Sequence, residues 1–520
     1  MAFPRNQKLN LLRLTVLLIV ALAGIKFIFR DSVTPDLHKH ISKDNDFWGK
    51  AGEEKEEANP HNQALELSAV KIMGPKEDTK KQLSKDFSTT EMRLVHLDLK
   101  GAAPKVSYLE QVFPLLSKLG ANGILVEYED MFPFKGELET LKSSYAYSED
   151  DIEKIQRLAA LSKLEVVPLV QTFGHVEFIL KHDKYRYLRE VERFPNSLNP
   201  HLPDTLSLLK SILSQVMDKH RHSSWIHIGA DEVFHLGEGM DSKNWISLNN
   251  GDVGKMYLNH IKEVVNFIVN QYKGLQVLMW DDMLRKISVG AIQESGIPKH
   301  ASPVLWFYAP DFDTEQIGGR QSPPISRPLC PVLLMSFALS RLYDHYSVLC
   351  ELLPVGIPSL AMCLQTLVNG GFSEATNKKI LDVLGFQNIH LEKSTCEGNG
   401  AFPGSEIYRM VEQINGQLKE SIAKVLEEES AIKGWFSPYH RKHQFGNPRN
   451  LENFGSKVLK VHEDWENFIQ NFRSQLESIY FPDTVEEWME ENVNPYMDRL
   501  REFVRDYREI IRLNAKPKAL

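Results

Sequence analysis

Residues 92–130 read MRLVHLDLKGAAPKVSYLEQVFPLLSKLGANGILVEYED. An apolar run over 93–99 meets Gly101, a helical pattern over 107–120 ends on a glycine, and a second apolar run follows. This order predicts a buried strand, a helix and a second buried strand, which together form one β–α–β unit. Strands joined through a covering helix run parallel, so the stretch favours a parallel sheet.

The same alternation continues to about residue 308. Further strands are predicted at 165–175, 225–232, 275–283 and 302–308, with helices at 148–164, 202–220 and 254–274. Polar residues recur at the carboxyl ends of these strands: Asp98, Glu127, His175, Asp231, Glu232, Asp281 and Asp282. A (β/α)8 barrel gathers such ends into one mouth. No Gly-x-Gly-x-x-Gly follows any strand, which argues against a dinucleotide-binding doubly wound sheet. We therefore expect an α/β fold of the TIM-barrel type.

The predicted barrel is shortened around its seventh and eighth strands. Only residues 309–342 separate the sixth predicted strand from the next helical stretch. One β–α unit alone takes about thirty residues, so two strands and a helix do not fit there. The segment PVLLMSFAL at 331–339 supplies one strand.

Beyond the barrel the pattern changes to long amphipathic helices. We expect a barrel catalytic domain over 91–370 and an α-helical region over 371–520. The helices of the latter are predicted at 405–435, 453–480 and 485–513. Residues 31–90 are polar and charge-rich without an apolar period, which predicts a disordered stem.

Residues 1–30 carry basic residues around the apolar run LTVLLIVALAGI. This pattern predicts a signal anchor, hence a single-pass membrane protein of the ER or Golgi type, or a cleaved signal and secretion. The sequence contains no Asn-x-Ser/Thr sequon, which favours the alternative of a location in the cytoplasm or nucleus.

Composition excludes some classes of partner. The 520 residues carry a formal charge of −8, whereas nucleic-acid binding demands a basic surface, so no nucleic-acid partner is expected. The four cysteines, at 330, 350, 363 and 396, show no zinc-ligand spacing. We expect no metal and no cofactor, and the sequence carries no signal for an oligomeric state.

Two adjacent acids stand out in SSWIHIGADEVFHLGEG, residues 223–239. Asp231 and Glu232 follow directly on an apolar strand, where a barrel places its active site. Neighbouring carboxylates resist losing both protons, so we expect Glu232 to stay protonated as a general acid while Asp231 remains charged. The plain alternative is a pair of solvated loop acids.

Four motifs resemble glycoside hydrolase family 20, the β-N-acetylhexosaminidases. HIGADEV is similar to the family's His-x-Gly-x-Asp-Glu signature, and RLVHLD, FGH and WDDM resemble its first-, third- and fifth-strand motifs in the right order. The resemblance covers roughly residues 92–511. It implies hydrolysis of terminal N-acetyl-β-hexosaminides on glycoconjugates, with retention of configuration.

The resemblance also implies a substrate-assisted mechanism, an exception to the two-carboxylate scheme. The sugar's acetamido oxygen attacks the anomeric carbon, Glu232 acts as acid and then base, and Asp231 orients the acetamido N–H. Further substrate-binding side chains are expected at Arg93, Asp98, His175, Trp280, Asp281 and Trp306.

Two other readings stay open. Family members carry a tyrosine and a tryptophan on the last strands, yet this sequence has no tryptophan between Trp306 and Trp435. A catalytically impaired relative that binds carbohydrate or protein is therefore one alternative. The other is a metal-dependent barrel hydrolase, although no His-x-His ends any strand.

Overall fold

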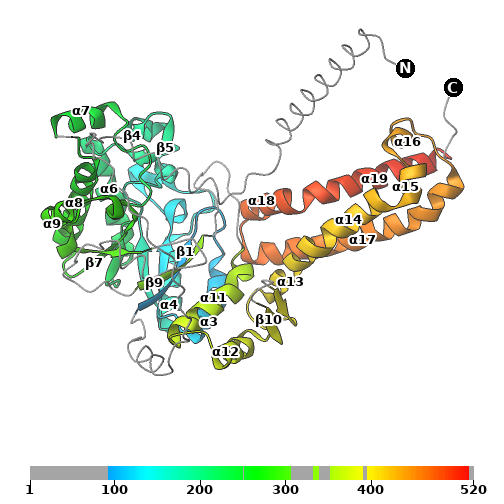
Figure 1. The fold of residues 1–520 in the computed structure, drawn as a ribbon, viewed down its shortest axis with the longest axis horizontal. Coiled ribbons are helices and arrows are strands. Elements are labelled where there is room, and N and C mark those ends of the chain that lie inside the picture. Colours follow the sequence, from blue (N-terminus) through cyan, green and yellow to red (C-terminus); the bar gives the residue numbers. More distant parts are fainter. Residues whose placement is uncertain (1–91, 250, 306–331, 339–351, 391–394, 515–520) are drawn as a thin grey trace, which may run out of the picture. The chain divides into compact units, whose positions relative to one another are not determined.

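The computed structural model describes residues 92–249, 251–305, 332–338, 352–390 and 395–514. Its centre is a parallel sheet in the order β8-β7-β6-β3-β2-β1-β9 (Figure 1). The strands are β1 (Met92–Asp98), β2 (Gly123–Glu127), β3 (Glu165–Leu169), β6 (Trp225–His227), β7 (Gln276–Trp280), β8 (Ala301–Val304) and β9 (Val332–Ala338). All six strands predicted before residue 309 are present, and the strand predicted within 331–339 is β9.

The prediction of a shortened barrel is confirmed. β9 pairs in parallel with β1 along its whole length, from Met92 opposite Val332 to Asp98 opposite Ala338. This is the place that the last strand of a closed barrel takes beside the first. At the other end of the sheet lies β8, and among the described residues β8 and β9 form no ladder with each other. The described residues thus form a seven-stranded parallel sheet, one strand fewer than a (β/α)8 barrel has.

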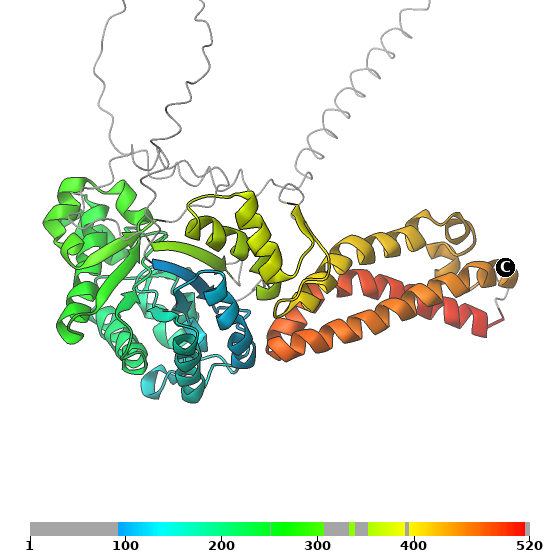
Figure 2. The ribbon, with the colours of Figure 1, turned by 90° about the horizontal axis from the view of Figure 1, so that it is seen from below.

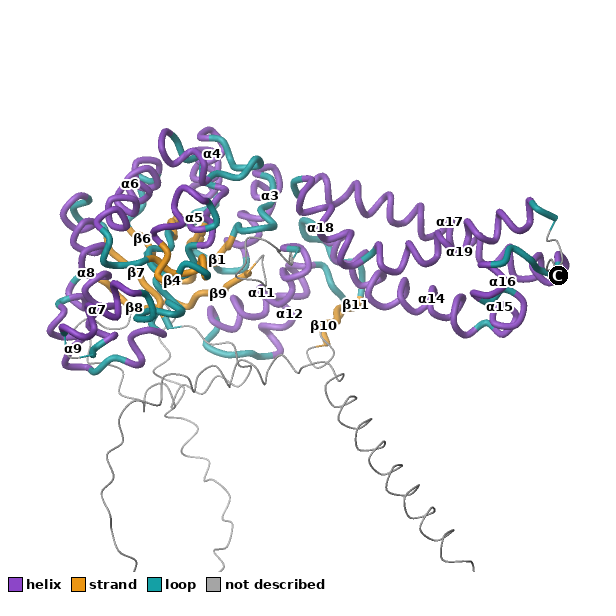
Figure 3. Tube along the Cα trace, turned by 90° about the horizontal axis from the view of Figure 1, so that it is seen from above, coloured by secondary structure: helices purple, strands orange, loops and turns teal. Residues whose placement is uncertain are grey.

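Helices cover the outer face of this sheet (Figure 3). They are α3 (Val106–Lys118), α4 (Glu149–Leu161), α6 (Pro203–Lys219), α8 (Val253–Gln271) and α9 (Val289–Ser295). The start of α4 is fixed by a capping box, in which the Ser148 side chain and the side chain of Asp151 each bond the other's backbone N–H. Helix α11 (Leu353–Val368) follows the barrel strands. The amide of its Gln365 donates to the carbonyl of Leu119, at the C-terminal end of α3, at 2.6 Å.

Alternation along the strands divides the core in two. Val95 and Ile124 face the helices in the larger apolar cluster. Leu94, Leu125 and Leu278 face inward and form a separate apolar cluster inside the barrel. Nearer the carboxyl ends of the strands, the inward positions become polar or aromatic, and this layer underlies the candidate site.

Smaller elements lie on loops at the carboxyl ends of the strands. After β3 come α5 (Glu177–Leu180) and an antiparallel hairpin of β4 (Arg189–Val191) and β5 (Phe194–Leu198). After β6 comes α7 (Met240–Leu248). Figure 1 shows α7, β4 and β5 close together.

The C-terminal region is helical, as predicted, apart from a small hairpin. Its elements are α12 (Glu374–Leu384), β10 (Asn388–His390), β11 (Thr395–Glu397), α13 (Ser405–Gln413), α14 (Lys419–Ala423), α15 (Ser430–Trp435), α16 (Pro438–Lys442), α17 (Pro448–Ile479), α18 (Pro482–Asn492) and α19 (Asn494–Arg512). The two longest, α17 and α19, run side by side as the orange and red helices of Figure 2. Tyr480, just after α17, accepts a 2.8 Å hydrogen bond from the backbone N–H of Leu353. This hydrogen bond joins the region before residue 371 to the helical region after it. The domain boundary at residue 371 itself stays a prediction.

The predicted membrane location needs correction. Among the described residues, no helix combines the length and the apolar character needed to cross a bilayer. The single-pass assignment is therefore not supported. The predicted anchor (1–30) and stem (31–90) lie outside the described residues.

Candidate active site

Asp231 and Glu232 lie on the turn that follows β6, at the carboxyl end of the sheet. The backbone there is left-handed at Gly229, Ala230 and Glu232, with φ of +62°, +69° and +41°. A residue with a Cβ atom adopts this conformation at a cost, so such a turn persists only where its surroundings hold it. The turn also ends the strand's alternation, so neighbouring side chains are no longer forced to opposite faces.

His175 brings the two acids together. It follows β3, with a left-handed φ of +51°. Its Nε2 atom lies 3.2 Å from Oε2 of Glu232 and 3.4 Å from Oδ2 of Asp231. One imidazole N–H thus serves both carboxylates, and the three side chains form a single cluster at the mouth of the barrel. The sequence prediction placed all three here.

The cluster shifts the pKa of two of its members. Burial alone would lower the pKa of His175, but Asp231 and Glu232 outweigh burial and raise it to about 10. At neutral pH His175 is therefore a cation. Burial raises the pKa of Asp231 to about 7, and the attraction of His175 limits this rise. The sequence predicts an Asp231 that simply remains charged, whereas in the structure its proton is released only near neutrality.

One carboxylate oxygen of Asp231 has no hydrogen-bond partner among the described residues. This oxygen is the buried Oδ1, whereas Oδ2 faces His175. A buried acceptor without a donor costs about 1–3 kcal/mol, so a ligand N–H that reaches Oδ1 recovers free energy.

Three side chains from three different parts of the chain hold the turn. Gln171 accepts from the N–H of Ala230 at 3.2 Å, and Asp282 accepts from the N–H of Glu232 at 2.9 Å. The hydroxyl of Tyr257, on α8, donates to the carbonyl of Ala230 at 2.8 Å. The sequence prediction missed these positioning residues. Only Asp282 carried a signal, as the second acid of WDDM.

Two glycines allow the loops to approach this closely. A Cβ atom on Gly174 would lie 2.2 Å from the carbonyl oxygen of Asp231, and one on Gly229 would lie 1.9 Å from Oε1 of Gln171. Real Cβ atoms do not approach other atoms so closely. The turn and the loop after β3 therefore fit together only where both positions lack a side chain.

Below the acids lies a buried polar layer. Glu127 accepts hydrogen bonds from His96 at 2.9 Å and from the amide of Gln171 at 3.0 Å. Burial opposes its ionisation, but Lys100 and these hydrogen bonds lower the pKa of Glu127 well below its usual range. His227 lies in the same interior and accepts from the N–H of Gly229 at 3.0 Å. Gln171 thus connects this layer to the catalytic turn.

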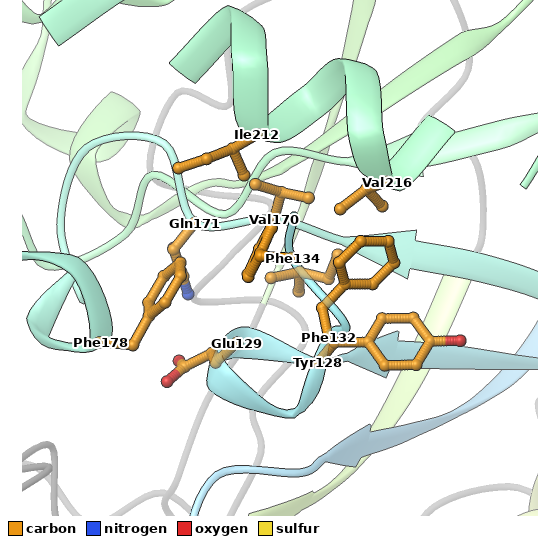
Figure 4. A pocket seen from close by; sticks show the side chains of 10 residues that line it. Tyr128, Glu129, Phe132, Phe134, Val170, Gln171, Phe178, Ile212 and Val216 are labelled. Atoms are coloured by element: carbon orange, nitrogen blue, oxygen red, sulfur yellow. The ribbon is translucent and has the colours of Figure 1, made fainter. Parts of the chain in front are cut away.

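Figure 4 shows a small cavity beside Gln171. Its volume of about 10 Å³ holds no more than a water molecule. Phe134, Phe178 and Val170 are among its walls, and neither Asp231 nor Glu232 lines it. Its size and its lining exclude it as the place for a sugar.

Asp98 is the next predicted residue. It lies at the carboxyl end of β1, buried, with its Oδ2 atom 2.5 Å from Nζ of Lys100. The ammonium of Lys100 is also 3.2 Å from Glu129. The carboxylate of Asp98 is thus bound by a neighbouring cation at the edge where the acids lie.

Arg93 does not join the acids. It is the second residue of β1, and its Nε atom donates to the carbonyl of Gly120 at 2.6 Å. Five residues of strand, about 16 Å, separate it from Asp98 at the carboxyl end. The predicted contact of Arg93 with sugar hydroxyls is therefore wrong, because its guanidinium lies at the opposite end of the barrel from the acids.

The aromatic and acidic residues at the end of β7 and just after it take different positions. Trp280 is 6% exposed, and its ring lies 4.4 Å from the His227 ring, inside the barrel. Asp281 is gripped by Arg285 through two hydrogen bonds of 2.6 and 2.5 Å, so its carboxylate is already occupied. It is Asp282 that reaches the catalytic turn. Trp306 lies outside the described residues.

Comparison with known proteins finds a family model and several hexosaminidases that are similar to this chain. Residues 106–306 match the family model "Glycosyl hydrolase family 20, catalytic domain". Hexosaminidase D of Homo sapiens is 41% identical over 461 residues, which is 81% of this chain and 95% of that protein. Hexosaminidase D of Bos taurus is 42% identical over 339 residues, 57% of this chain and 98% of that protein.

Among solved structures, a β-N-acetylhexosaminidase from Bacteroides fragilis aligns at 19% identity and a TM-score of 0.37, over 48% of this chain and half of that one. A family 20 enzyme from Streptomyces coelicolor aligns at 15% and 0.33, over 45% of each chain. At 41% identity over nearly the whole length of a curated relative, the sequence comparison is decisive, and this chain belongs to glycosyl hydrolase family 20.

Proposed function

We propose that the protein is a retaining β-N-acetylhexosaminidase that removes terminal N-acetyl-β-hexosamine residues, of the galactose or glucose type, from glycoconjugates. Membership of the family supports the reaction class. The observation that carries the residue roles is the unpartnered, buried Oδ1 of Asp231, next to Glu232 on one turn. An acetamido N–H is the donor that such an acceptor lacks.

In the first step, the acetamido carbonyl oxygen of the bound sugar attacks the anomeric carbon. The glycosidic bond breaks, and Glu232 gives its proton to the leaving oxygen. Asp231 accepts the acetamido N–H and stabilises the positive charge of the cyclic oxazolinium. His175, as a cation that contacts both carboxylates, positions the pair.

In the second step, Glu232 takes a proton from water while the water oxygen attacks the anomeric carbon. The ring opens, the acetamido group is restored, and two inversions give net retention. Trp280, on the barrel interior next to His227, supplies the apolar surface for the sugar. Asp98 and Asp281 act through their cation partners Lys100 and Arg285, as supports for the loops and not as sugar ligands.

The test is hydrolysis by the purified full chain of 4-methylumbelliferyl N-acetyl-β-galactosaminide and N-acetyl-β-glucosaminide. The matched substrates are the same glycosides without the acetyl group. Glu232→Gln is expected to lower kcat by about 10²- to 10⁴-fold, and Glu238→Gln, an exposed acid of the same loop, serves as control. Equal cleavage of acetylated and deacetylated substrates would overturn the mechanism. Binding of the N-acetylated sugars without turnover would favour a silent, carbohydrate-binding relative.

A further inference from the structure

An exposed aromatic ring stands next to the acid pair. Phe234 is 47% exposed, although it follows Glu232 by only two residues. Its ring meets the His175 ring edge-on, with centroids 6.4 Å apart and planes at 86°. A large apolar side chain beside a polar cluster gains little from folding in this position, because half its surface stays in water.

The backbone that carries this ring is fixed on both sides. The N–H of Phe234 donates to the carbonyl of Glu232 at 2.7 Å, and its own carbonyl accepts from the hydroxyl of Ser197 at 2.9 Å. The next residue, His235, stacks on Phe194 with centroids 4.2 Å apart and planes at 8°. Ser197 and Phe194 both belong to β5, so the β4–β5 hairpin holds the loop that carries Phe234.

The far end of the same loop is held from β4. Glu190 is buried, and its carboxylate accepts from the backbone N–H groups of Gly237 and Gly239 at 2.9 and 3.1 Å. It also accepts from the hydroxyl of Ser242 at 2.9 Å. The ring of Phe234 is therefore exposed on a rigid loop, which is the arrangement that reduces the entropic cost of binding a ligand.

We propose that Phe234 is the platform for the leaving group of the substrate. The inference rests on the proposed function, because it takes Glu232 as the acid that protonates the glycosidic oxygen. That oxygen links a terminal sugar, bound at the barrel mouth near the carboxyl end of β7 and Trp280, to the rest of the glycoconjugate, which leads out to solvent. The half-exposed ring of Phe234, two residues after Glu232, is therefore positioned to contact the leaving group as it extends into solvent.

The chemistry of the ring defines the class of leaving group. An aromatic face binds flat groups with apolar C–H edges, such as the face of a pyranose ring or an aryl group. The protein thus favours substrates in which a ring directly follows the scissile bond, over those that carry a short alkyl group there.

The experiment compares 4-nitrophenyl and methyl N-acetyl-β-galactosaminide as substrates of the full chain. Phe234→Ala is expected to lower kcat/KM for the aryl glycoside by about three- to tenfold, with less than a twofold change for the methyl glycoside. Phe234→Tyr is expected to retain the aryl value. Phe372→Ala is the matched control, because Phe372 is 48% exposed and lies far along the chain, before α12.

Each outcome decides the proposal. If Phe234→Ala lowers kcat/KM equally for both glycosides, the ring only positions His175 and the platform is wrong. If the wild-type chain turns over neither glycoside, the proposed function fails, and the platform is then judged by binding of the two matching thioglycosides in calorimetry. If Phe234→Ala still binds the aryl thioglycoside more tightly than the methyl thioglycoside, by the same ratio as the wild type, the platform proposal is wrong.

Discussion

A methyl group on Gly229 would lie 1.9 Å from the side-chain oxygen of Gln171. The same oxygen accepts the N–H of Ala230, and the amide nitrogen of Gln171 donates to Glu127. One uncharged side chain therefore spans from the polar layer inside the barrel to the turn that carries the acids. Its fit depends on the absence of a Cβ atom at a single position.

Gly229→Ala is expected to disrupt this fit. The left-handed backbone costs an alanine about 1–2 kcal/mol, and the contact with Gln171 must be relieved by movement of the turn. Both unfolding free energy and kcat/KM should fall. Gly290→Ala, where a Cβ atom meets nothing within 4 Å, is the control. Thermal unfolding and initial rates measure the two effects, and an unchanged rate in Gly229→Ala would contradict the role assigned to the turn.

Gln171→Met keeps the approximate size of the side chain but removes both hydrogen bonds. The buried carboxylate of Glu127 and the N–H of Ala230 then lose a partner, at about 1–3 kcal/mol for each unpaired group. We expect lower stability and a lower kcat, measured by urea unfolding and by initial rates. Gln111→Met, on the exposed face of α3, should change neither. Full activity in Gln171→Met would show that the turn holds itself.

The rate should depend on pH through Asp231. Burial raises the pKa of this carboxyl to about 7, and the proposed mechanism uses its anion. Below pH 7, kcat/KM should therefore fall about tenfold per pH unit, and above pH 7 this limb should level off. A profile recorded from pH 5 to 9 tests this, with Asp231→Asn as the comparison. Persistence of the acid limb in Asp231→Asn would assign it to another group.

His220 should make the protein sensitive to acid. It is fully buried, and burial lowers its pKa to about 4. Because the unfolded chain binds this proton near pH 6.5, the contribution of His220 to stability is present above pH 6.5 and is lost as pH falls toward 4. The loss is about 1.4 kcal/mol per pH unit in that window.

His220→Gln keeps an acceptor for the hydroxyl of Tyr128, which lies 3.1 Å from Nε2 of His220. The stability gap between wild type and this variant should therefore narrow from pH 7 to pH 5 in urea unfolding. His222→Gln, at an exposed site two residues on, should cost less than about 0.5 kcal/mol at pH 7. A gap that stays constant with pH would refute the assignment.

Tyr480 links the helical region to the residues that follow the barrel strands. Tyr480→Phe removes the acceptor for the buried N–H of Leu353, which should cost about 1–3 kcal/mol. Tyr439→Phe, at a 49% exposed site, is the matched control and should be near neutral. Differential scanning calorimetry measures both variants. Equal melting temperatures would show that this hydrogen bond contributes nothing to holding the two regions together.

Much of the fold follows from the sequence because each β–α unit carries its own signal. Periodic apolar runs and glycine punctuation located six strands, and the apolar run at 331–339 located β9. The acid pair and His175 were predictable for the same reason, since polar residues at the carboxyl ends of barrel strands meet at one mouth.

For other residues the prediction from sequence was wrong or missing, for physical reasons. Arg93 is the first residue of the predicted strand and the second of β1, so it lies at the end opposite the mouth. Its contact with the sugar was expected from the family resemblance alone. At Asp281 and Asp282 the strand has already ended, so alternation no longer decides which acid turns inward. The i to i+4 contact with Arg285 draws Asp281 away. Gln171 is uncharged and is followed by Thr172, so no titratable group at this position marks it in the sequence.

The close fit of the loop at Gly174 against the carbonyl of Asp231 also affects how fast the site forms during folding. His175 and Glu232 are 57 residues apart in the chain, so they meet only after a long loop has closed and β3 has paired with β6. Helices that depend on nearby residues form sooner. During refolding from denaturant, recovery of enzymatic turnover should therefore lag behind recovery of the helical circular dichroism signal.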